Sequence, residues 1–268
     1  MRLIEAFGLK KSYSSREGSQ ARHVAVDDVS LTIEKGESVA LVGETGSGKS
    51  TLGRMVAGLL APDEGAVRLA GVDLYTLSRA EQRRIRRRIQ WIPQMPSSTL
   101  NPRYTVYQTL DEVLVTHYPS LPRAERGRRI ERTLRGVGLD GVRISRRTGA
   151  LSIGQQQRLA ICRALILEPD FVICDEITSG LDGCLELQVL ELLKAIRAST
   201  EVAYLFITHN LSITPFLCDR LIVFRNGRIV EEGELQELVK TPKKDYSKKL
   251  MRAAFAHLPN TGPQPSKP

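Results

Sequence analysis

A glycine-rich run between an apolar stretch and an amphipathic one constrains this chain most. Residues 43–51 read Gly-Glu-Thr-Gly-Ser-Gly-Lys-Ser-Thr and follow the apolar run at 37–42. The next apolar residues recur at the i, i+3, i+4, i+7 spacing of one helix face, namely Leu52, Met55, Val56 and Leu59. A strand, a glycine loop and a helix in this order predict an α/β protein with a phosphate-binding loop.

The chemistry of this loop suits a nucleoside triphosphate. Glycines let successive backbone N–H groups face one centre, and the positive end of the following helix adds to the same anion site. In this pattern Lys49 neutralises β- and γ-phosphate oxygens, and the Ser50 hydroxyl ligates Mg²⁺. A glycine turn that only caps a helix would not need the complete pattern. We therefore expect nucleotide contacts from the whole loop: Gly43, Glu44, Thr45, Gly46, Ser47, Gly48, Lys49, Ser50 and Thr51.

Two acidic residues follow a later apolar run of buried-strand length. Asp175 and Glu176 come directly after residues 171–174, Phe-Val-Ile-Cys. Because α/β sheets bind ligands at the carboxyl ends of their strands, Asp175 is predicted to hold Mg²⁺ and Glu176 to polarise an attacking water as general base. Alone, the pair could equally be a solvated strand end. Together with the phosphate loop it predicts hydrolysis of a nucleoside triphosphate.

The remaining pattern predicts a mainly parallel sheet with a helical insertion. Apolar runs of strand length occur at 3–9, 24–33, 65–70, 90–93, 203–207 and 220–224. Helical spacing is found at 79–89, over most of 105–167, and at Val189, Leu192, Leu193 and Ile196 between two of the strands. Alternation of strands and helices favours parallel pairing.

The net charge of +9, from 39 Lys plus Arg against 30 Asp plus Glu, indicates an anionic partner such as a nucleotide, nucleic acid or acidic lipid. The arginine-rich runs at 83–88 and 123–147 could equally be solvated helix faces. No nucleic-acid-reading motif accompanies them, so no nucleic acid is expected.

The cysteine spacing and the length of the apolar runs indicate the cellular compartment of the chain. Cys162, Cys174, Cys184 and Cys218 show no Cys-x-x-Cys spacing, so reduced thiols are favoured over metal ligands. No apolar run approaches the length of about 18 residues that spans a bilayer. Glu5 interrupts the apolar character that a secretory signal would need. We therefore expect a cytoplasmic chain that does not itself cross a membrane.

Between the two predicted sites, residues 151–158 read Leu-Ser-Ile-Gly-Gln-Gln-Gln-Arg. This run resembles the Leu-Ser-Gly-Gly-Gln signature of the ATP-binding-cassette (ABC) family. The order of motifs is also similar to that family: phosphate loop, Gln94, signature, Asp175-Glu176, Ser179–Asp182 and His209. The resemblance covers residues 1 to about 240. It implies an ATP hydrolase with the ABC-ATPase fold, in which a mainly parallel core carries an antiparallel β subdomain and a helical insertion.

Domain bounds follow from the same resemblance. The ABC ATPase domain is expected over 1–258, with the helical subdomain at about 95–167 and a C-terminal extension at about 240–258. Residues 259–268, with several prolines and little that could pack, are expected to be a flexible tail.

Further site residues are implied by the resemblance alone. Tyr13 would stack on adenine, Gln94 would contact Mg²⁺ and the attacking water, and His209 would hold the γ-phosphate. Taken singly, these residues could be a surface aromatic, a loop amide and a strand-end cap. Asp182 is also expected among the nucleotide-binding residues.

In this family two cassettes pair head to tail. Ser152, Gly154 and Gln155 of one subunit would therefore complete the ATP site of the other. Ile153 stands where the family usually has glycine, and a β-branched residue limits close backbone approach. We expect this signature to work less efficiently as a result.

Residues 96–103, Pro-Ser-Ser-Thr-Leu-Asn-Pro-Arg, resemble the importers for oligopeptides, dipeptides and nickel or metal chelates. Such importers combine two different cassettes with two transmembrane permease subunits and are fed by an extracytoplasmic substrate-binding protein. The resemblance implies a peripheral subunit on the cytoplasmic face of the inner or plasma membrane. Its loop at 94–103 and helical insertion would receive the permeases, and its basic faces would lie near anionic lipid. The cargo, peptide or metal chelate, stays open.

Two alternatives remain at this stage. A soluble ABC-type ATPase acting on DNA or ribosomes has the basic charge balance as its only support, and the segment between phosphate loop and signature is too short for a long coiled coil. A regulatory module that seldom hydrolyses ATP is suggested by Ile153. Glu176 and His209 argue against that second alternative.

Overall fold

A computed structural model describes residues 1–14, 22–96 and 99–255. The expected flexible tail at 259–268 lies outside these residues. Four strands form an antiparallel sheet in the order β2-β1-β4-β5: β1 (Arg2–Ser14), β2 (Arg22–Glu34), β4 (Glu64–Leu69) and β5 (Val72–Asp73). The antiparallel β subdomain is thus confirmed.

The second sheet has six strands in the order β10-β9-β3-β8-β7-β6. They are β3 (Ser38–Val42), β6 (Ile89–Ile92), β7 (Phe171–Asp175), β8 (Ala203–Thr208), β9 (Arg220–Arg225) and β10 (Arg228–Glu234). All neighbours pair in parallel except β9 and β10. The mainly parallel core is confirmed, and β10 is an antiparallel edge strand that the sequence pattern did not reveal.

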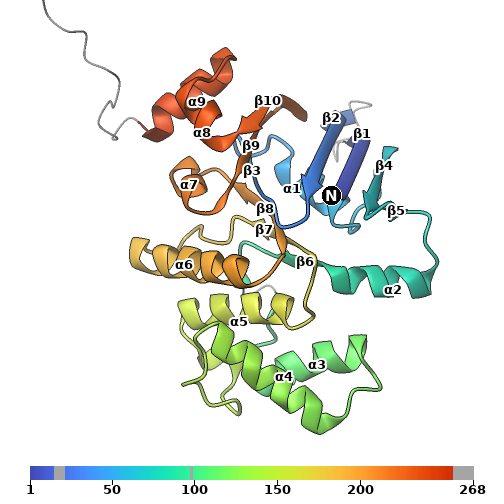
Figure 1. The fold of residues 1–268 in the computed structure, drawn as a ribbon, viewed down its shortest axis with the longest axis vertical. Coiled ribbons are helices and arrows are strands. Elements are labelled where there is room, and N and C mark those ends of the chain that lie inside the picture. The colour runs from blue at the N-terminus through green and yellow to red at the C-terminus, as the bar shows by residue number, and fades with distance from the viewer. Residues whose placement is uncertain (15–21, 97–98, 256–268) are drawn as a thin grey trace, which may run out of the picture.

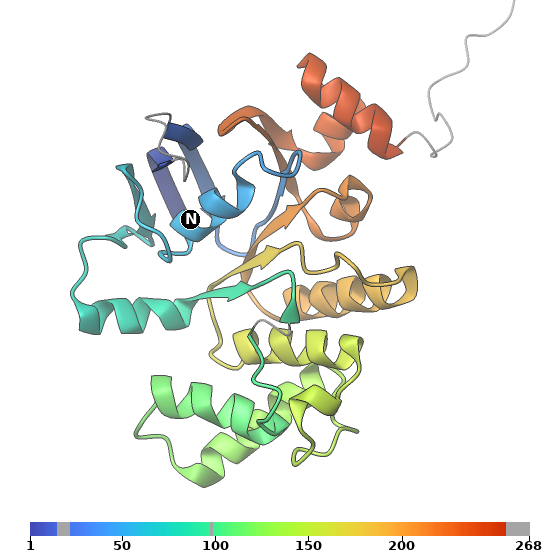
Figure 2. The same ribbon diagram turned by 180° about the vertical axis from the view of Figure 1, so that it is seen from behind.

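The helices lie on both faces of the six-stranded sheet and at its two ends (Figure 1). They are α1 (Lys49–Val56), α2 (Arg79–Arg88), α3 (Val106–His117), α4 (Arg123–Gly136), α5 (Ile153–Leu165), α6 (Gly183–Ser199), α7 (Thr214–Leu217), α8 (Leu235–Lys240) and α9 (Asp245–Phe255), with the 3-10 turns η2 (Thr148–Ala150) and η3 (Leu211–Ile213). Figure 2 shows from behind that α3, α4 and α5 gather at one end of the molecule and α8 and α9 at the other. The C-terminal helices begin at Leu235, earlier than the extension expected at about 240.

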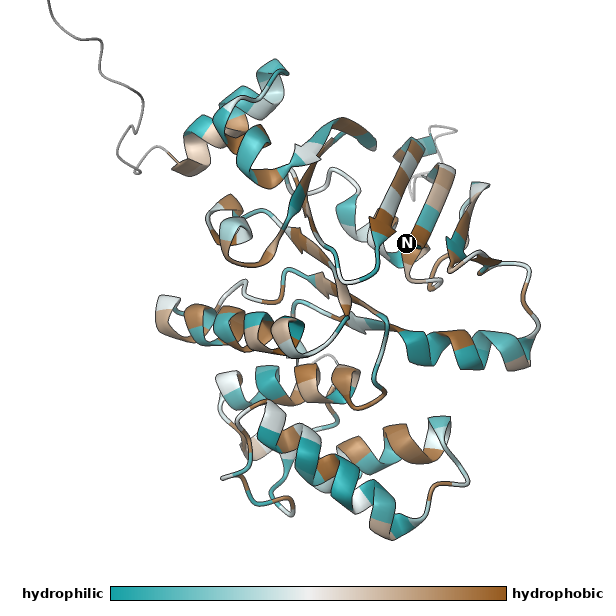
Figure 3. Cartoon of the chain, in the orientation of Figure 1, coloured by the Kyte–Doolittle hydropathy of each residue, from teal (hydrophilic) through white to brown (hydrophobic). Residues whose placement is uncertain are grey.

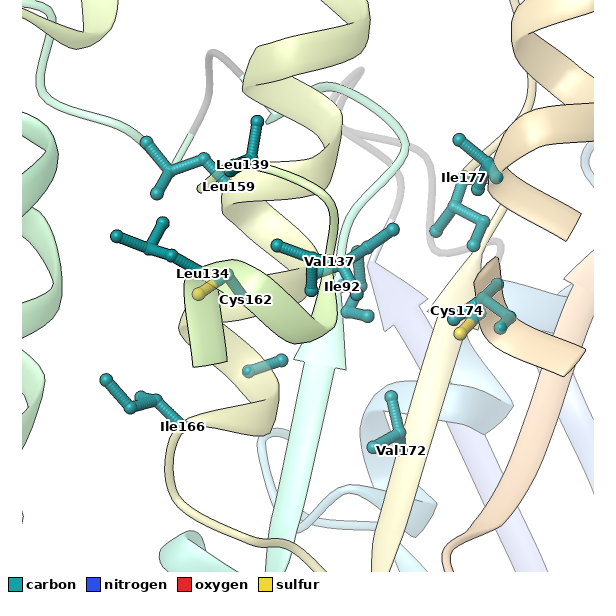
Figure 4. Close-up of a cluster of buried hydrophobic side chains, with 14 of the residues drawn as sticks. Ile92, Leu134, Val137, Leu139, Leu159, Cys162, Ile166, Val172, Cys174 and Ile177 are labelled. Atoms are coloured by element: carbon teal, nitrogen blue, oxygen red, sulfur yellow. The ribbon is translucent and has the colours of Figure 1, made fainter. Parts of the chain in front are cut away.

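Two large hydrophobic clusters hold these layers together. One joins α4 and α5 to β6 and β7, as Figure 4 shows for Leu159 and Cys162 of α5 and Val172 and Cys174 of β7. The other lies between the antiparallel sheet, α1 and the far face of the central sheet, and contains Phe171. Figure 3 shows hydrophobic residues along the central strands and a mostly hydrophilic α2. The helical insertion therefore shares its core with the sheet.

The strand order places the predicted site residues at one edge. The neighbouring strands β3, β8 and β7 run in parallel, with Val42 opposite Thr208 and Asp175 opposite Ile207. Because parallel strands end at the same side, the phosphate loop, Glu176 and His209 all leave the sheet there. None of the helices in the described ranges is long and apolar enough to span a membrane.

Substitution of Phe171 tests whether this buried core sets the stability. Phe171 is fully buried at the start of β7, so Phe171→Ala is expected to lower the free energy of unfolding by about 3–5 kcal/mol. Leu187→Ala on α6 is the control, because Leu187 is about half exposed, and it should change that free energy by less than about 0.5 kcal/mol. Urea unfolding measures both. If Phe171→Ala lowers the free energy of unfolding by less than about 1 kcal/mol, the placement of Phe171 in the buried core is contradicted.

Candidate functional site

The phosphate loop between β3 and α1 fits its surroundings only with glycine at two positions. Gly43 (φ 157°) would place a Cβ 2.0 Å from the Phe224 carbonyl oxygen of β9. Gly48, the N-cap of α1 with φ 104°, would place one 2.0 Å from the Ala25 carbonyl oxygen of β2. The loop therefore packs between a strand of each sheet. These contacts fix the positions of its backbone N–H groups.

Lys49 is the cation of this loop. Its side chain is buried, and its Nζ donates hydrogen bonds to the carbonyl oxygens of Gly43 at 2.9 Å and Glu44 at 2.7 Å. Burial lowers the pKa of Lys49, against the opposing charges of Glu176, Asp175 and Glu44. An ammonium has three donors, so one remains for an anion. Phosphate binding would compensate the cost of burying this charge.

Ser50 and Asp175 face each other beside Lys49. The Ser50 hydroxyl donates to Asp175 Oδ1 at 3.1 Å. Burial raises the pKa of Asp175, the Glu176 charge adds to that effect, and the Ser50 hydrogen bond opposes it. A hydroxyl oxygen beside a carboxylate whose negative charge is only partly compensated fits a hard divalent cation. The residues predicted for Mg²⁺ therefore suit that ion.

Glu176 and His209 form the second pair. Glu176 Oε1 lies 3.2 Å from His209 Nδ1, and the Glu176 side chain is mostly buried. The Glu176 backbone is left-handed (φ 50°), and its N–H donates to the Ile207 carbonyl at 2.8 Å. A non-glycine residue in this region costs about 1–3 kcal/mol, which is a typical feature of residues held for function. Asp175 is the last residue of β7, and Glu176 begins the turn that follows it.

A cavity of about 320 Å³ brings most of the predicted residues together. Its wall includes Tyr13, Thr45, Gly46, Gly48, Lys49, Ser50, Thr51, Gln94, Asp175 and Glu176. Gln94 also donates from Nε2 to Ser179 Oγ at 3.2 Å. A second cavity of about 200 Å³ shares Glu176 and adds His209 and Ser179. The catalytic candidates therefore line two cavities that share Glu176.

His23 also lines the nucleotide cavity and was not singled out from the sequence. It pairs with Tyr13 across β1 and β2. The sequence pattern predicts one strand that ends at residue 9 and a second that begins at residue 24. The pairing of Tyr13 with His23 lies beyond both ends and could not be predicted. An extension of both strands toward the intervening polar segment is the signal that would have revealed it.

The signature residues do not reach this cavity within the same chain. Ser152 is the N-cap of α5, and its hydroxyl accepts the Gln155 N–H at 3.3 Å while Gln155 Oε1 accepts the Ser152 N–H at 3.1 Å. Ile153 is 64% exposed. Gly154 lies tightly against α6, where a Cβ would be 2.9 Å from a Leu185 methyl carbon. Their role in nucleotide binding stays a prediction.

Asp182 likewise lies outside the cavity wall. Its Oδ1 accepts the N–H groups of Cys184 at 3.1 Å and Leu185 at 3.0 Å, which caps α6. The structure thus gives Asp182 a capping role, and its predicted contact with nucleotide stays a prediction.

A phosphate loop of this geometry beside a Ser–Asp pair and a Glu–His pair defines a P-loop nucleoside triphosphatase. Residues 26–179 match the sequence profile of the ABC transporter family. This chain therefore belongs to the ABC transporter family, and its fold is that of an ABC-type ATPase.

Individual proteins agree with this assignment. The chain is 39% identical over 253 residues to the ABC transporter ATP-binding protein YejF of Escherichia coli K12, covering 93% of this chain and 48% of the relative, so it spans about half of that protein. It is 40% identical over 253 residues to the oligopeptide transport ATP-binding protein AmiF of Streptococcus pneumoniae, covering 94% and 81%. The dimeric, post-hydrolysis structure of the ATP-binding cassette MJ0796 with ADP and Pi superposes with a TM-score of 0.77 at 27% identity, covering 87% of this chain and 99% of that one.

The two glycines of the loop offer a matched test. Gly48→Ala adds a Cβ that would lie 2.0 Å from the Ala25 carbonyl, so the loop must move, and we expect ATP affinity to fall more than tenfold, a loss above about 1.4 kcal/mol. Gly46 also has positive φ, but a Cβ there meets nothing within 4 Å. Gly46→Ala should cost only about 1–2 kcal/mol of backbone strain in stability. Calorimetric titration with ATP separates the two, and equal affinities would contradict the steric argument.

Asp175→Asn should stabilise the nucleotide-free chain. Because burial raises the pKa of Asp175, the folded chain keeps a proton that the unfolded chain has lost, and stability falls as pH rises from about 4 through the raised pKa. The variant lacks this penalty, so its free energy of unfolding should exceed that of the wild type at pH 7, with the difference shrinking toward pH 4.

The measurement is urea unfolding across pH without nucleotide or Mg²⁺. Asp140→Asn is the control, because Asp140 is exposed, and it should show no such pH-dependent gain. Destabilisation of Asp175→Asn at pH 7 would mean that the Ser50 hydrogen bond outweighs burial.

Proposed function

We propose that this chain is the ATP-binding and hydrolysing subunit of an importer for peptides. The observation that carries the hydrolytic part of this proposal is the Glu176–His209 pair, held at 3.2 Å beside the phosphate loop and the Ser50–Asp175 pair. The peptide cargo is supported by the Streptococcus pneumoniae relative AmiF, which is named an oligopeptide transport ATP-binding protein. Metal chelates, including nickel, have no comparable support and are a less favoured cargo.

The residues around the cavity divide the work of phosphoryl transfer. The loop N–H groups and Lys49 accept the triphosphate, so its negative charge meets donors already in place. Mg²⁺, when held by Ser50, Asp175 and Gln94, would supply further charge compensation on the phosphate oxygens. Glu176 takes a proton from the attacking water, and His209 Nδ1 orients the Glu176 carboxylate. Gln94, anchored on Ser179, lies where it can position that water.

We further propose that a second cassette completes the site. Ser152, Gly154 and Gln155 stand at the start of α5, outside the nucleotide cavity of their own chain, with Ile153 exposed. A helix N-terminus and a serine hydroxyl are suited to bind phosphate charge. The related cassette with ADP and Pi is dimeric. A different second cassette is favoured, because an importer of this kind can then tolerate Ile153 in one of its two sites.

The membrane partners would dock on a groove of about 660 Å³ along β6, the strand that leads to the Gln94 loop. Its wall combines α2, β6 and the end of α3 and includes Leu59, Arg83, Arg86, Trp91 and His117. We propose that two permease subunits, served by an extracytoplasmic binding protein, hold the chain at the cytoplasmic face of the membrane. Helix α2 has no buried residue, and Arg83, Arg84 and Arg86 of this helix are exposed, so they are available to a permease segment or to anionic lipid.

The alternative of an ABC-type ATPase acting on DNA or ribosomes is not favoured. Its only support was the basic charge balance. Part of that charge is used within the fold, since Arg126 pairs with Asp111 and Arg88 with Asp170. The guanidinium carbons of Arg87 and Arg129 each lie 5.0 Å from the centre of the Tyr118 ring.

Glu176→Gln tests the proposed chemistry. The amide keeps the shape of the side chain but cannot take a proton, so we expect ATP turnover to fall at least 100-fold, within the roughly 10²–10⁴-fold range of general base catalysis. ATP affinity should stay within about twofold, because Lys49 and the loop are unchanged.

Turnover is measured by phosphate release and affinity by calorimetry. Glu191→Gln is the matched control, since Glu191 is exposed on α6, and it should leave both values unchanged. Undiminished turnover in Glu176→Gln would remove Glu176 as the base.

A further inference from the structure

Helix α5, which begins at the signature, makes a buried hydrogen bond to the turn that carries Glu176. Gln157 of this helix has only 1% of its surface exposed, and its Nε2 donates to the carbonyl oxygen of Ile177 at 2.8 Å. Ile177 directly follows Glu176 and is itself buried. Because a buried amide needs partners for its polar atoms, this hydrogen bond fixes the Gln157 side chain against the turn.

The turn that begins at Glu176 is held from several directions. The Glu176 N–H donates to the Ile207 carbonyl of β8 at 2.8 Å, and its carbonyl accepts the Ser179 N–H at 2.9 Å. Gln157 adds the contact from α5, through the Ile177 carbonyl. The left-handed backbone of Glu176 (φ 50°) is strained, and such a conformation persists only where the surrounding structure holds it. Loss of the Gln157 hydrogen bond would therefore let this backbone relax.

A relaxed backbone would move the Glu176 carboxylate, which now lies 3.2 Å from His209 Nδ1. A general base must stay within hydrogen-bond reach of the water that it activates. A displacement of about 1 Å can cost about 100-fold in rate. Gln157 itself is not among the residues that line the two cavities of the site. Its effect on the reaction would therefore pass through Glu176 and not through contact with the nucleotide.

We propose that Gln157 is a positioning residue for the general base, which holds the Glu176 turn in its strained conformation and joins that turn to the signature helix. Ser152 is the N-cap of the same helix. The hydrogen bond thus connects the part of α5 that would face a second cassette with this chain's own base. The inference rests on the proposed role of Glu176 in hydrolysis.

Gln157→Met in the full chain tests this role, because methionine is similar in size and cannot donate to the Ile177 carbonyl. We expect kcat for ATP, measured by phosphate release, to fall between about fivefold and about 100-fold. The Kd for a non-hydrolysable ATP analogue, measured by calorimetry, should stay within about twofold, since the phosphate loop is unchanged. Gln157→Asn withdraws the amide by one methylene group and should show the same split if the methionine variant does not fold.

The His209 imidazole reports the position of Glu176 without any turnover. The signal of a ring nitrogen depends on its hydrogen-bond partner, so nitrogen NMR of the full chain with isotopically labelled histidines can follow His209 Nδ1. His209→Gln assigns the signal. In Gln157→Met it should move toward its position in Glu176→Ala, where the carboxylate is absent.

Leu159→Ala is the control for a general weakening of α5, because Leu159 is fully buried on this helix and packs in a hydrophobic cluster. It should lower the melting temperature and leave kcat within about twofold and the His209 signal in place. An unchanged kcat or His209 signal in Gln157→Met, or an equal fall in kcat in Leu159→Ala, would overturn the inference and leave the proposed function intact. Undiminished turnover in Glu176→Gln would overturn the proposed chemistry and this inference with it.

Discussion

The close contact between the phosphate loop and two neighbouring backbones is the constraint on which the site depends. Gly43 lies against β9 and Gly48 against β2, each where a single Cβ would clash with a carbonyl oxygen. One contact belongs to the parallel sheet and the other to the antiparallel sheet. The loop is thus fixed at the junction of the two sheets, and its anion-binding N–H groups need little rearrangement to receive phosphate.

The same junction buries charges that the nucleotide-free chain compensates only in part. Lys49 loses solvation and donates to carbonyl oxygens of its own loop, while the Asp175 carboxylate accepts a hydrogen bond from a neutral hydroxyl, that of Ser50. Both arrangements lower the stability of the nucleotide-free chain. Each favours a ligand of opposite charge, an anion at Lys49 and a cation at Asp175. The left-handed backbone at Glu176 adds strain at the same edge. Stability and function therefore oppose each other within a few residues.

The parts of the site that the sequence predicts are those encoded locally. The phosphate loop, the Asp-Glu pair and the strand–helix alternation each lie in one short segment, so their spacing was enough. Residues whose role depends on distant partners were missed. His23 reaches the cavity through its register with Tyr13 across β1 and β2. The edge strand β10 and the start of α8 also lack a distinct local pattern.

The central claim, that this cassette works only with a second cassette and permeases, is tested most directly by isolating the tagged chain from its own cells. The extraction uses mild detergent and a non-hydrolysable ATP analogue with Mg²⁺, and mass spectrometry identifies what is retained. The account predicts a second, different ABC ATPase and two polytopic membrane proteins, with the second cassette released when the nucleotide is removed. Recovery of the chain with ribosomal proteins or nucleic acid, and without a membrane partner, would contradict it.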